Sequence, residues 1–186
     1  VALVTERRLV QQALIESEDK FKYVFDHSVV GKSFTLPSGE INVNQAFCDL
    51  LGYSSNELKD RTWQEISHPD DLELTQNAIN ALLSGEKESV RFTKRYLHKN
   101  GSVVWTDLGT ALRRDKNLQP LYFMTTILDI TERKLAEDAL KEAKEYAENL
   151  IQTANTMVVG MDTRGNINVF NQAAEAITGY TLSEIK

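Results

Sequence analysis

Mostly apolar residues recur at alternating spacings of three and four in two stretches of the chain. The first stretch has Val10, Leu14, Ser17, Phe21 and Val24 in this pattern. The second has Ala136, Leu140, Ala143, Ala147, Leu150 and Ala154. This spacing predicts one helix over residues 1–20 and another from Thr131 to about Thr153, roughly 35 Å long at 1.5 Å per residue. Each seam is narrow, which favours a parallel homodimer through both helices over packing of each helix on its own domain.

Between these helices, runs of aromatic and β-branched residues bounded by turn residues predict five strands. The predicted strands are Val29–Leu36, Glu40–Asn44, Val90–His98, Val103–Arg114 and Leu121–Leu128. Three helices are predicted between the second and third strands, at Gln45–Leu51, Ser55–Lys59 and Asp70–Ser84. His68 and Pro69 mark the start of the last of these helices. The expected fold is α+β, a five-stranded antiparallel sheet with helices on one face.

The chain contains an internal repeat. Gly39-Glu-Ile-Asn-Val recurs 126 residues later as Gly165-Asn-Ile-Asn-Val, and Asn44-Gln-Ala recurs 127 residues later as Asn171-Gln-Ala. The predicted organisation is a helix at 1–20, a domain at 21–130, a linker helix at 131–153 and an incomplete second domain at 154–186. This second copy holds two predicted strands and two short helices. It lacks the strands that complete the sheet, so we expect it to pack on a neighbour or to be poorly ordered.

Composition narrows the class of protein. The 186 residues are 41% hydrophobic and 26% charged, as in a globular domain, and the net charge of −6 argues against a nucleic-acid surface. No apolar run approaches the ~20 residues that cross a bilayer, and the chain opens without a signal peptide. A single cysteine, Cys48, fits a reducing compartment. We expect a cytoplasmic location, either free or as the cytoplasmic part of a membrane-anchored sensor.

No arrangement of residues predicts catalysis. A Gly-x-Ser-x-Gly elbow, a phosphate-binding glycine loop and a His-Glu-x-x-His pair are all missing from the sequence. The carboxylates of Asp70, Asp71 and Glu73 lie in a first helical turn, where the helix dipole explains them without a cation. The three histidines lack a second ligand at metal spacing, so no metal site is expected. We therefore expect this segment to be no enzyme.

Several segments, in order, resemble a PAS domain with its C-terminal PAC motif. They are Gly39–Phe47, Leu51–Tyr53 with Glu57-Leu58, His68–Asp71, the Tyr96–Trp105 hairpin and Asp129–Lys134. The resemblance covers residues 21 to 134, and the repeat makes the chain similar to a tandem PAS fragment. It implies a sensory or dimerisation module of a multidomain signalling protein. Such proteins are most often two-component sensor histidine kinases or cyclic-dinucleotide enzymes, in which the kinase or cyclase is a separate output domain.

The resemblance also places a cleft between the sheet and the helices. In the last strand Phe123, Thr125 and Ile127 share one face by alternation, and the resemblance turns that face inward. The other expected lining residues are Phe47, Trp63, Ile79 and Tyr96. Such walls suit a small, mostly hydrophobic ligand, and they suit a filled core equally well. The identity of the ligand stays open.

The cofactor-binding members of the family give sharper expectations. In the flavin photoreceptors a reactive cysteine stands where this chain has Trp63, and a glutamine stands where it has Ile127. Tyr96 and Thr106 stand where those proteins have asparagines. These departures, with Cys48 on a different helix, argue against a covalent flavin adduct. They weaken non-covalent flavin binding but leave it open. Haem in the family takes a histidine from the helix that matches Asp70–Ser84, which has none.

Two functions remain from the sequence. In the first, a ligand or redox change in the cleft shifts the sheet and moves the helix that begins at Thr131. Asp129 and Thr131 join the last strand to this helix and are the expected signal-relay residues. In the second, the domain is a ligand-free dimerisation or spacer module.

Overall fold

The computed structural model describes the backbone of residues 2–185 and the side chains of residues 7–185. The chain divides into two compact units, residues 1–132 and residues 133–186. The first unit holds the predicted sheet, and the second holds most of the linker helix and the second repeat. Each unit is described by itself.

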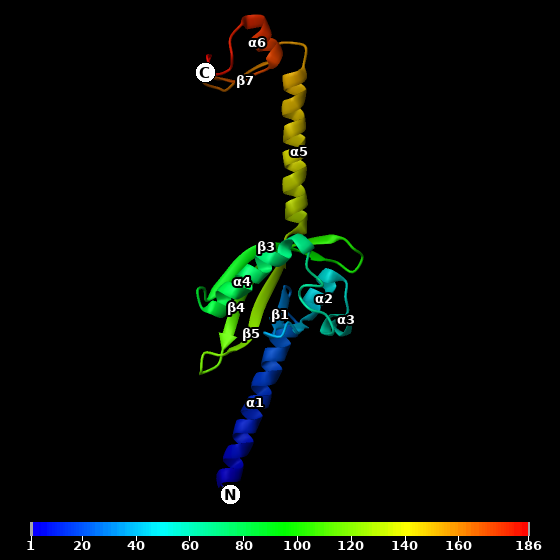
Figure 1. The fold of residues 1–186 in the computed structure, drawn as a ribbon, viewed down its shortest axis with the longest axis vertical. Helices are drawn as coiled ribbons and strands as arrows, with labels where there is room; N and C mark the ends of the chain where they lie inside the picture. The colour runs from blue at the N-terminus through cyan, green and yellow to red at the C-terminus, as the bar shows by residue number, and fades with distance from the viewer. Residues whose placement is uncertain (1, 186) are drawn as a thin grey trace. The chain divides into compact units, whose positions relative to one another are not determined.

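The first unit is built on a five-stranded antiparallel sheet (Figure 1), as predicted. Its strands are β1 (Gly31–Thr35), β2 (Ile41–Val43), β3 (Ser89–Leu97), β4 (Val103–Arg114) and β5 (Pro120–Asp129), in the order β2-β1-β5-β4-β3. Strand β1 begins at Gly31, not at the predicted Val29. The amide of Asn44 donates to the carbonyl of Val30, and the hydroxyl of Ser28 accepts from the Val30 N–H, so side chains occupy the groups that a strand would use.

Short helices cover one face of this sheet (Figure 1). They are α2 (Gln45–Leu51), α3 (Ser55–Lys59), the 3₁₀ turn η1 (Pro69–Asp71) and α4 (Leu72–Ser84). The predicted helix at Asp70 therefore begins with a 3₁₀ turn. His68 caps it, as expected, because its Nδ1 accepts the N–H of Asp70. The hydrophobic core between helices and sheet includes Phe47, Leu51 and Leu108, all at most 2% exposed.

Helix α1 (Ala2–Asp26) extends six residues beyond the predicted end at residue 20. Its last turns contact the face of the sheet that the other helices leave uncovered. The ring of Phe25 lies 5.0 Å from the ring of Phe34, which in turn lies 5.3 Å from that of Tyr122. The earlier seam residues remain exposed, and Leu14 keeps 57% of its surface accessible. Of the α1 side chains that the structure describes, those of the last turns are thus the ones packed on the domain.

The second unit contains most of α5 (Thr131–Thr153) and the start of the second repeat. The repeat forms β6 (Val159–Met161), β7 (Ile167–Phe170) and α6 (Gln172–Thr178). Of the two short helices predicted in the second copy, only α6 forms within the described residues, and residues 182–184 form a turn. Asn171 caps α6 and donates to the carbonyls of Ile151 and Thr156. Asn44 makes the equivalent bonds in the first repeat, where it caps α2 and donates to the carbonyl of Phe25.

Helix α5 has a charged surface with alanine and leucine in its seam, and none of its residues is buried. Leu140 is 72% exposed. Within residues 2–185, no helix combines the length and apolar character needed to span a bilayer.

Candidate functional site

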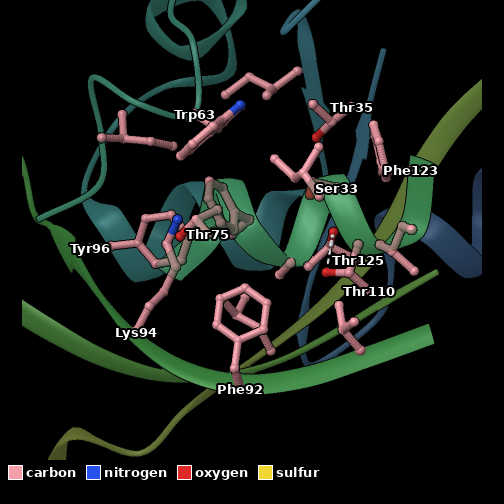
Figure 2. A pocket seen from close by; sticks show the side chains of 18 of the residues that line it. Ser33, Thr35, Trp63, Thr75, Phe92, Lys94, Tyr96, Thr110, Phe123 and Thr125 are labelled. Atoms are coloured by element: carbon pink, nitrogen blue, oxygen red, sulfur yellow. Dashed lines mark hydrogen bonds between the residues drawn. The ribbon is translucent and has the colours of Figure 1, made fainter. Parts of the chain in front are cut away.

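A cavity of about 60 Å³ lies between the sheet and the helices of the first unit (Figure 2). Six of the seven residues predicted to line a cleft do line it: Phe47, Trp63, Ile79, Tyr96, Phe123 and Thr125. Ile127 is not among the lining residues. It shares the inward face of β5 with Phe123 and Thr125, but it lies opposite Gly31 in the sheet register and is buried in the core cluster with Phe47.

The cavity walls are mainly apolar, with both aliphatic and aromatic side chains, and several hydroxyl groups lie among them. Phe47 and Tyr96 meet edge to face with their ring centres 5.5 Å apart. The hydroxyls of Thr110 on β4 and Thr125 on β5 are hydrogen-bonded at 3.0 Å. Figure 2 shows this threonine pair near Ser33, on the opposite side of the cavity from Tyr96. The cavity therefore offers apolar surface together with a few groups that can orient a ligand.

A buried lysine, Lys94 on β3, lines the same cavity, and the sequence reasoning missed it. Its side chain is only 2% exposed. The ammonium group donates a hydrogen bond of 2.6 Å to the hydroxyl of Ser67 and lies 4.4 Å from the ring centre of Tyr96 and 5.3 Å from that of Trp63. Burial lowers the pKa of Lys94 to about 7. A side chain with this pKa changes charge near neutrality, which an ordinary surface lysine does not do.

The available sequence signal for Lys94 was the alternation of β3. Val90, Phe92, Lys94 and Tyr96 occupy every second position and all line the cavity. Because inward and outward residues alternate along a strand, a lysine between Phe92 and Tyr96 falls on the inward face.

The cavity is small compared with the size of the flavin that some members of the family bind. Pockets for drug-sized molecules occupy roughly 300–1,000 Å³, so a cavity of about 60 Å³ in this conformation does not accommodate a flavin ring system. Cys48 is buried in the core and is not a lining residue, and burial raises the pKa of its thiol. Across residues 7–185, no group of three or more histidine, cysteine or acidic side chains is placed to hold a metal ion.

An ion pair connects β3 to the start of α4. The guanidinium of Arg95 donates to both carboxylate oxygens of Asp71, at 3.0 Å from Nε and 2.7 Å from Nη2. These hydrogen bonds lower the pKa of Asp71 below its usual value. The same guanidinium lies 5.3 Å from the ring centre of Trp105 on β4. Arg95, the residue after Lys94, thus links Asp71 at the start of α4 with Trp105 on β4, the strand next to the exit of the domain.

The two predicted signal-relay residues lie at that exit. The hydroxyl of Thr131 accepts the backbone N–H of Trp105 at 3.0 Å, and the N–H of Ile130 donates to the carbonyl of Trp105 at 2.9 Å. Asp129 accepts the N–H of Thr131 at 2.8 Å. The first residue of α5 is therefore hydrogen-bonded directly to β4. The structure brings Asp129 and Thr131 together at this junction, away from the cavity lining.

Comparison with known proteins agrees with this architecture. A family model described as the PAS fold matches residues 40–127, and a second PAS-fold model matches residues 145–186. A solved structure of a sensory box histidine kinase/response regulator from Burkholderia thailandensis E264 is similar, with 25% sequence identity and a TM-score of 0.56. The match covers 70% of this chain and 99% of that one.

Two curated relatives are much longer proteins. The chain is 34% identical over 139 residues to the probable diguanylate cyclase DgcE of Escherichia coli (strain K12), covering 74% of this chain and 13% of DgcE. It is 29% identical over 181 residues to the sensor histidine kinase TmoS of Ectopseudomonas mendocina, covering 94% of this chain and 18% of TmoS. The chain thus spans less than a fifth of either relative. Two PAS-fold matches in tandem, on the predicted five-stranded antiparallel sheet, show that this chain belongs to the PAS family, with one PAS domain followed by part of a second.

Proposed function

We propose that this chain is the sensory segment of a longer cytoplasmic signalling protein with a kinase or cyclase output domain. In this proposal a small ligand in the cavity changes the position of β3 and β4, and the change passes into α5. The observation that carries the proposal is the hydrogen bond between Thr131 and the backbone of Trp105, because it ties the first residue of α5 to the sheet that forms the cavity.

A continuous set of contacts supports this route. Lys94 lines the cavity, and its backbone carbonyl accepts the hydroxyl of Thr106 on β4. The next residue, Arg95, pairs with Trp105 in the sheet register and lies against its ring. A ligand that moves β3 at Lys94 therefore displaces two neighbouring residues of β4. Trp105 is one of them, and its backbone holds Thr131.

The flanking helices support a homodimer as part of the same proposal. The seam residues of α1 and α5 are exposed in the single chain, including Val10, Leu14, Leu140 and Leu150. Alanines at three of the five seam positions within α5, Ala136, Ala143 and Ala147, allow a second helix to approach closely. A parallel dimer through both helices would bury these seams and carry a rotation or shift to the output domain.

Thr131 gives the direct test. In the full-length protein that contains this segment, Thr131→Val keeps the shape of the side chain but removes the hydroxyl, whereas Thr131→Ser keeps the hydroxyl. We expect Thr131→Val to abolish the difference between stimulated and basal output activity, with Thr131→Ser responding as the wild type. Circular dichroism on both variants checks that the fold is intact. A normal response of a folded Thr131→Val protein would show that the signal takes another route.

The small size of the cavity favours a second candidate, a ligand-free dimerisation or spacer domain. Native mass spectrometry of freshly purified protein separates the two candidates. A discrete additional mass on the folded chain supports sensing, and the mass of the bare polypeptide at all protein concentrations, with no response to added small molecules, supports the spacer.

A further inference from the structure

The environment of Lys94 is unusual for a buried cation. An ammonium group has three N–H donors. In the part of the chain that the structure describes, Lys94 donates one hydrogen bond, to Ser67, and has no carboxylate within 4.0 Å. Buried lysines are normally paired, because an isolated buried charge costs several kcal/mol. Two donors of Lys94 therefore remain for a group in the cavity.

The acidic side chain near Lys94, that of Asp71, is already hydrogen-bonded to Arg95. Asp71 acts on Lys94 electrostatically, but its carboxylate oxygens accept three hydrogen bonds from Arg95, two from the guanidinium and one from the backbone N–H. On β3 itself, Tyr96 is neutral at physiological pH because burial raises its pKa. The segment before η1 contributes Ser67 and Trp63, and α4 contributes Thr75, none of which carries a charge. Among the described residues, the positive charge of Lys94 thus lies against the ring faces of Tyr96 and Trp63 but has no acidic side chain as an ion-pair partner.

Size and shape restrict the ligand further. Lys94 extends from β3 toward Tyr96 and Thr75 at one side of the cavity (Figure 2). A single water needs roughly 10–15 Å³ of such space, so about 60 Å³ accommodates a ligand of about five heavy atoms. Phe92, Phe123 and Ile79 line the rest of the cavity and suit an aliphatic body.

From these observations we infer that the cavity binds a short-chain carboxylate, with one carboxylate oxygen accepting hydrogen bonds from Lys94 and the aliphatic chain against the aromatic walls. This inference rests on the proposed sensory function and names the chemical class of its ligand. A carboxylate supplies the missing counter-ion, and a charge-assisted hydrogen bond of this kind is stronger than one between neutral groups. Binding also favours the protonated form of Lys94, so affinity is linked to pH.

Propionate is the probe, and propionamide is its neutral analogue of the same shape. Both are titrated into ¹⁵N-labelled chain at constant ionic strength, up to about 10 mM, an affinity range open to a ligand of this size. The amide signals of Ser67, Lys94 and Tyr96 are followed. We expect propionate to bind at least tenfold more tightly than propionamide, and its dissociation constant to rise about tenfold or more between pH 6.5 and 8.5, because Lys94 loses its proton over this range.

Lys94→Met and Lys94→Gln should each raise the dissociation constant for propionate at least tenfold. Both variants are measured so that a folding defect in one of them does not decide the result. Lys116→Met is the matched control, because Lys116 is an exposed lysine in the turn between β4 and β5, and binding should not change. Equal binding of propionate and propionamide, or unchanged binding by both Lys94 variants, overturns the carboxylate assignment but leaves a ligand-binding sensor. No binding of either probe also overturns the assignment, while the sensory function is judged separately by the Thr131 variants.

Discussion

Replacing the buried lysine with an apolar side chain of similar length should stabilise the domain. Lys94 has a pKa of about 7 in the folded protein, against 10.5 for a lysine in water. At about 1.4 kcal/mol for each pKa unit, this difference corresponds to a cost of about 5 kcal/mol for burying the ammonium group at low pH. This cost already includes the attraction of the ammonium group to the ring faces of Tyr96 and Trp63. Because Lys94 is half protonated at pH 7, we expect Lys94→Met to raise the free energy of unfolding by about 4 kcal/mol at that pH.

The pH dependence has a definite direction. Between pH 7 and about 10 the unfolded chain keeps the proton on Lys94, whereas the folded chain has released it. The unfolded state then binds more protons, so the stability of the wild type rises with pH. From the two pKa values, the rise between pH 7 and 9 is about 2 kcal/mol. Lys94→Met lacks this contribution, so its advantage over the wild type should shrink over the same range.

Urea denaturation followed by tryptophan fluorescence at pH 6, 7, 8 and 9 measures both effects. Comparing the two proteins at each pH removes the contribution of other groups, including the Cys48 thiol. A Lys94→Met protein less stable than the wild type at pH 7 would refute the argument. So would a stability difference that does not change with pH. Either result would mean that the ammonium group is satisfied within the folded domain, which would also remove the basis for a carboxylate ligand.

Two further measurements test the packing of the domain and of the flanking helix. Gly52 has a positive φ of 71° at the end of α2, and an added Cβ would lie 2.4 Å from Nε2 of His98. Gly52→Ala should therefore destabilise the domain by more than the ~1–2 kcal/mol of left-handed strain alone. Gly85→Ala is the control in thermal unfolding, because Gly85 has a φ of 79° with open space around it, and equal melting of both variants would contradict the prediction. Leu140→Ser should weaken homodimerisation through α5 at least tenfold in analytical ultracentrifugation, because a leucine buried in the interface contributes about 2 kcal/mol from each chain. Glu142→Ser is the control and should have no effect, because Glu142 lies off the seam. Equal dimerisation of both variants would place the interface elsewhere.

The elements of this fold follow from local patterns in the sequence. Strand β4 and helix α5 have the predicted bounds, Val103–Arg114 and Thr131–Thr153, because alternation and heptad spacing are properties of neighbouring residues. The repeat of Asn44 at Asn171 likewise marked the start of a second copy, and in the structure both asparagines cap a helix. Six of the seven residues expected at the cleft border the cavity; their inward placement came from the resemblance to the PAS family, and alternation along β5 grouped Phe123 with Thr125.

What only the tertiary structure decided is where on that face the cavity lies and what charge it contains. Ile127 and Phe123 share one face of β5, yet only Phe123 borders the cavity, because β1 and α2 close the core over Ile127. A lysine in a strand usually reaches water, and its own neighbours in sequence do not prevent that. Lys94 is buried because Ser67 and Trp63, some 27 to 31 residues earlier in the chain, fold over it. The alternation of β3 could have placed Lys94 on the inward face, but how deeply its charge is buried depends on these long-range contacts.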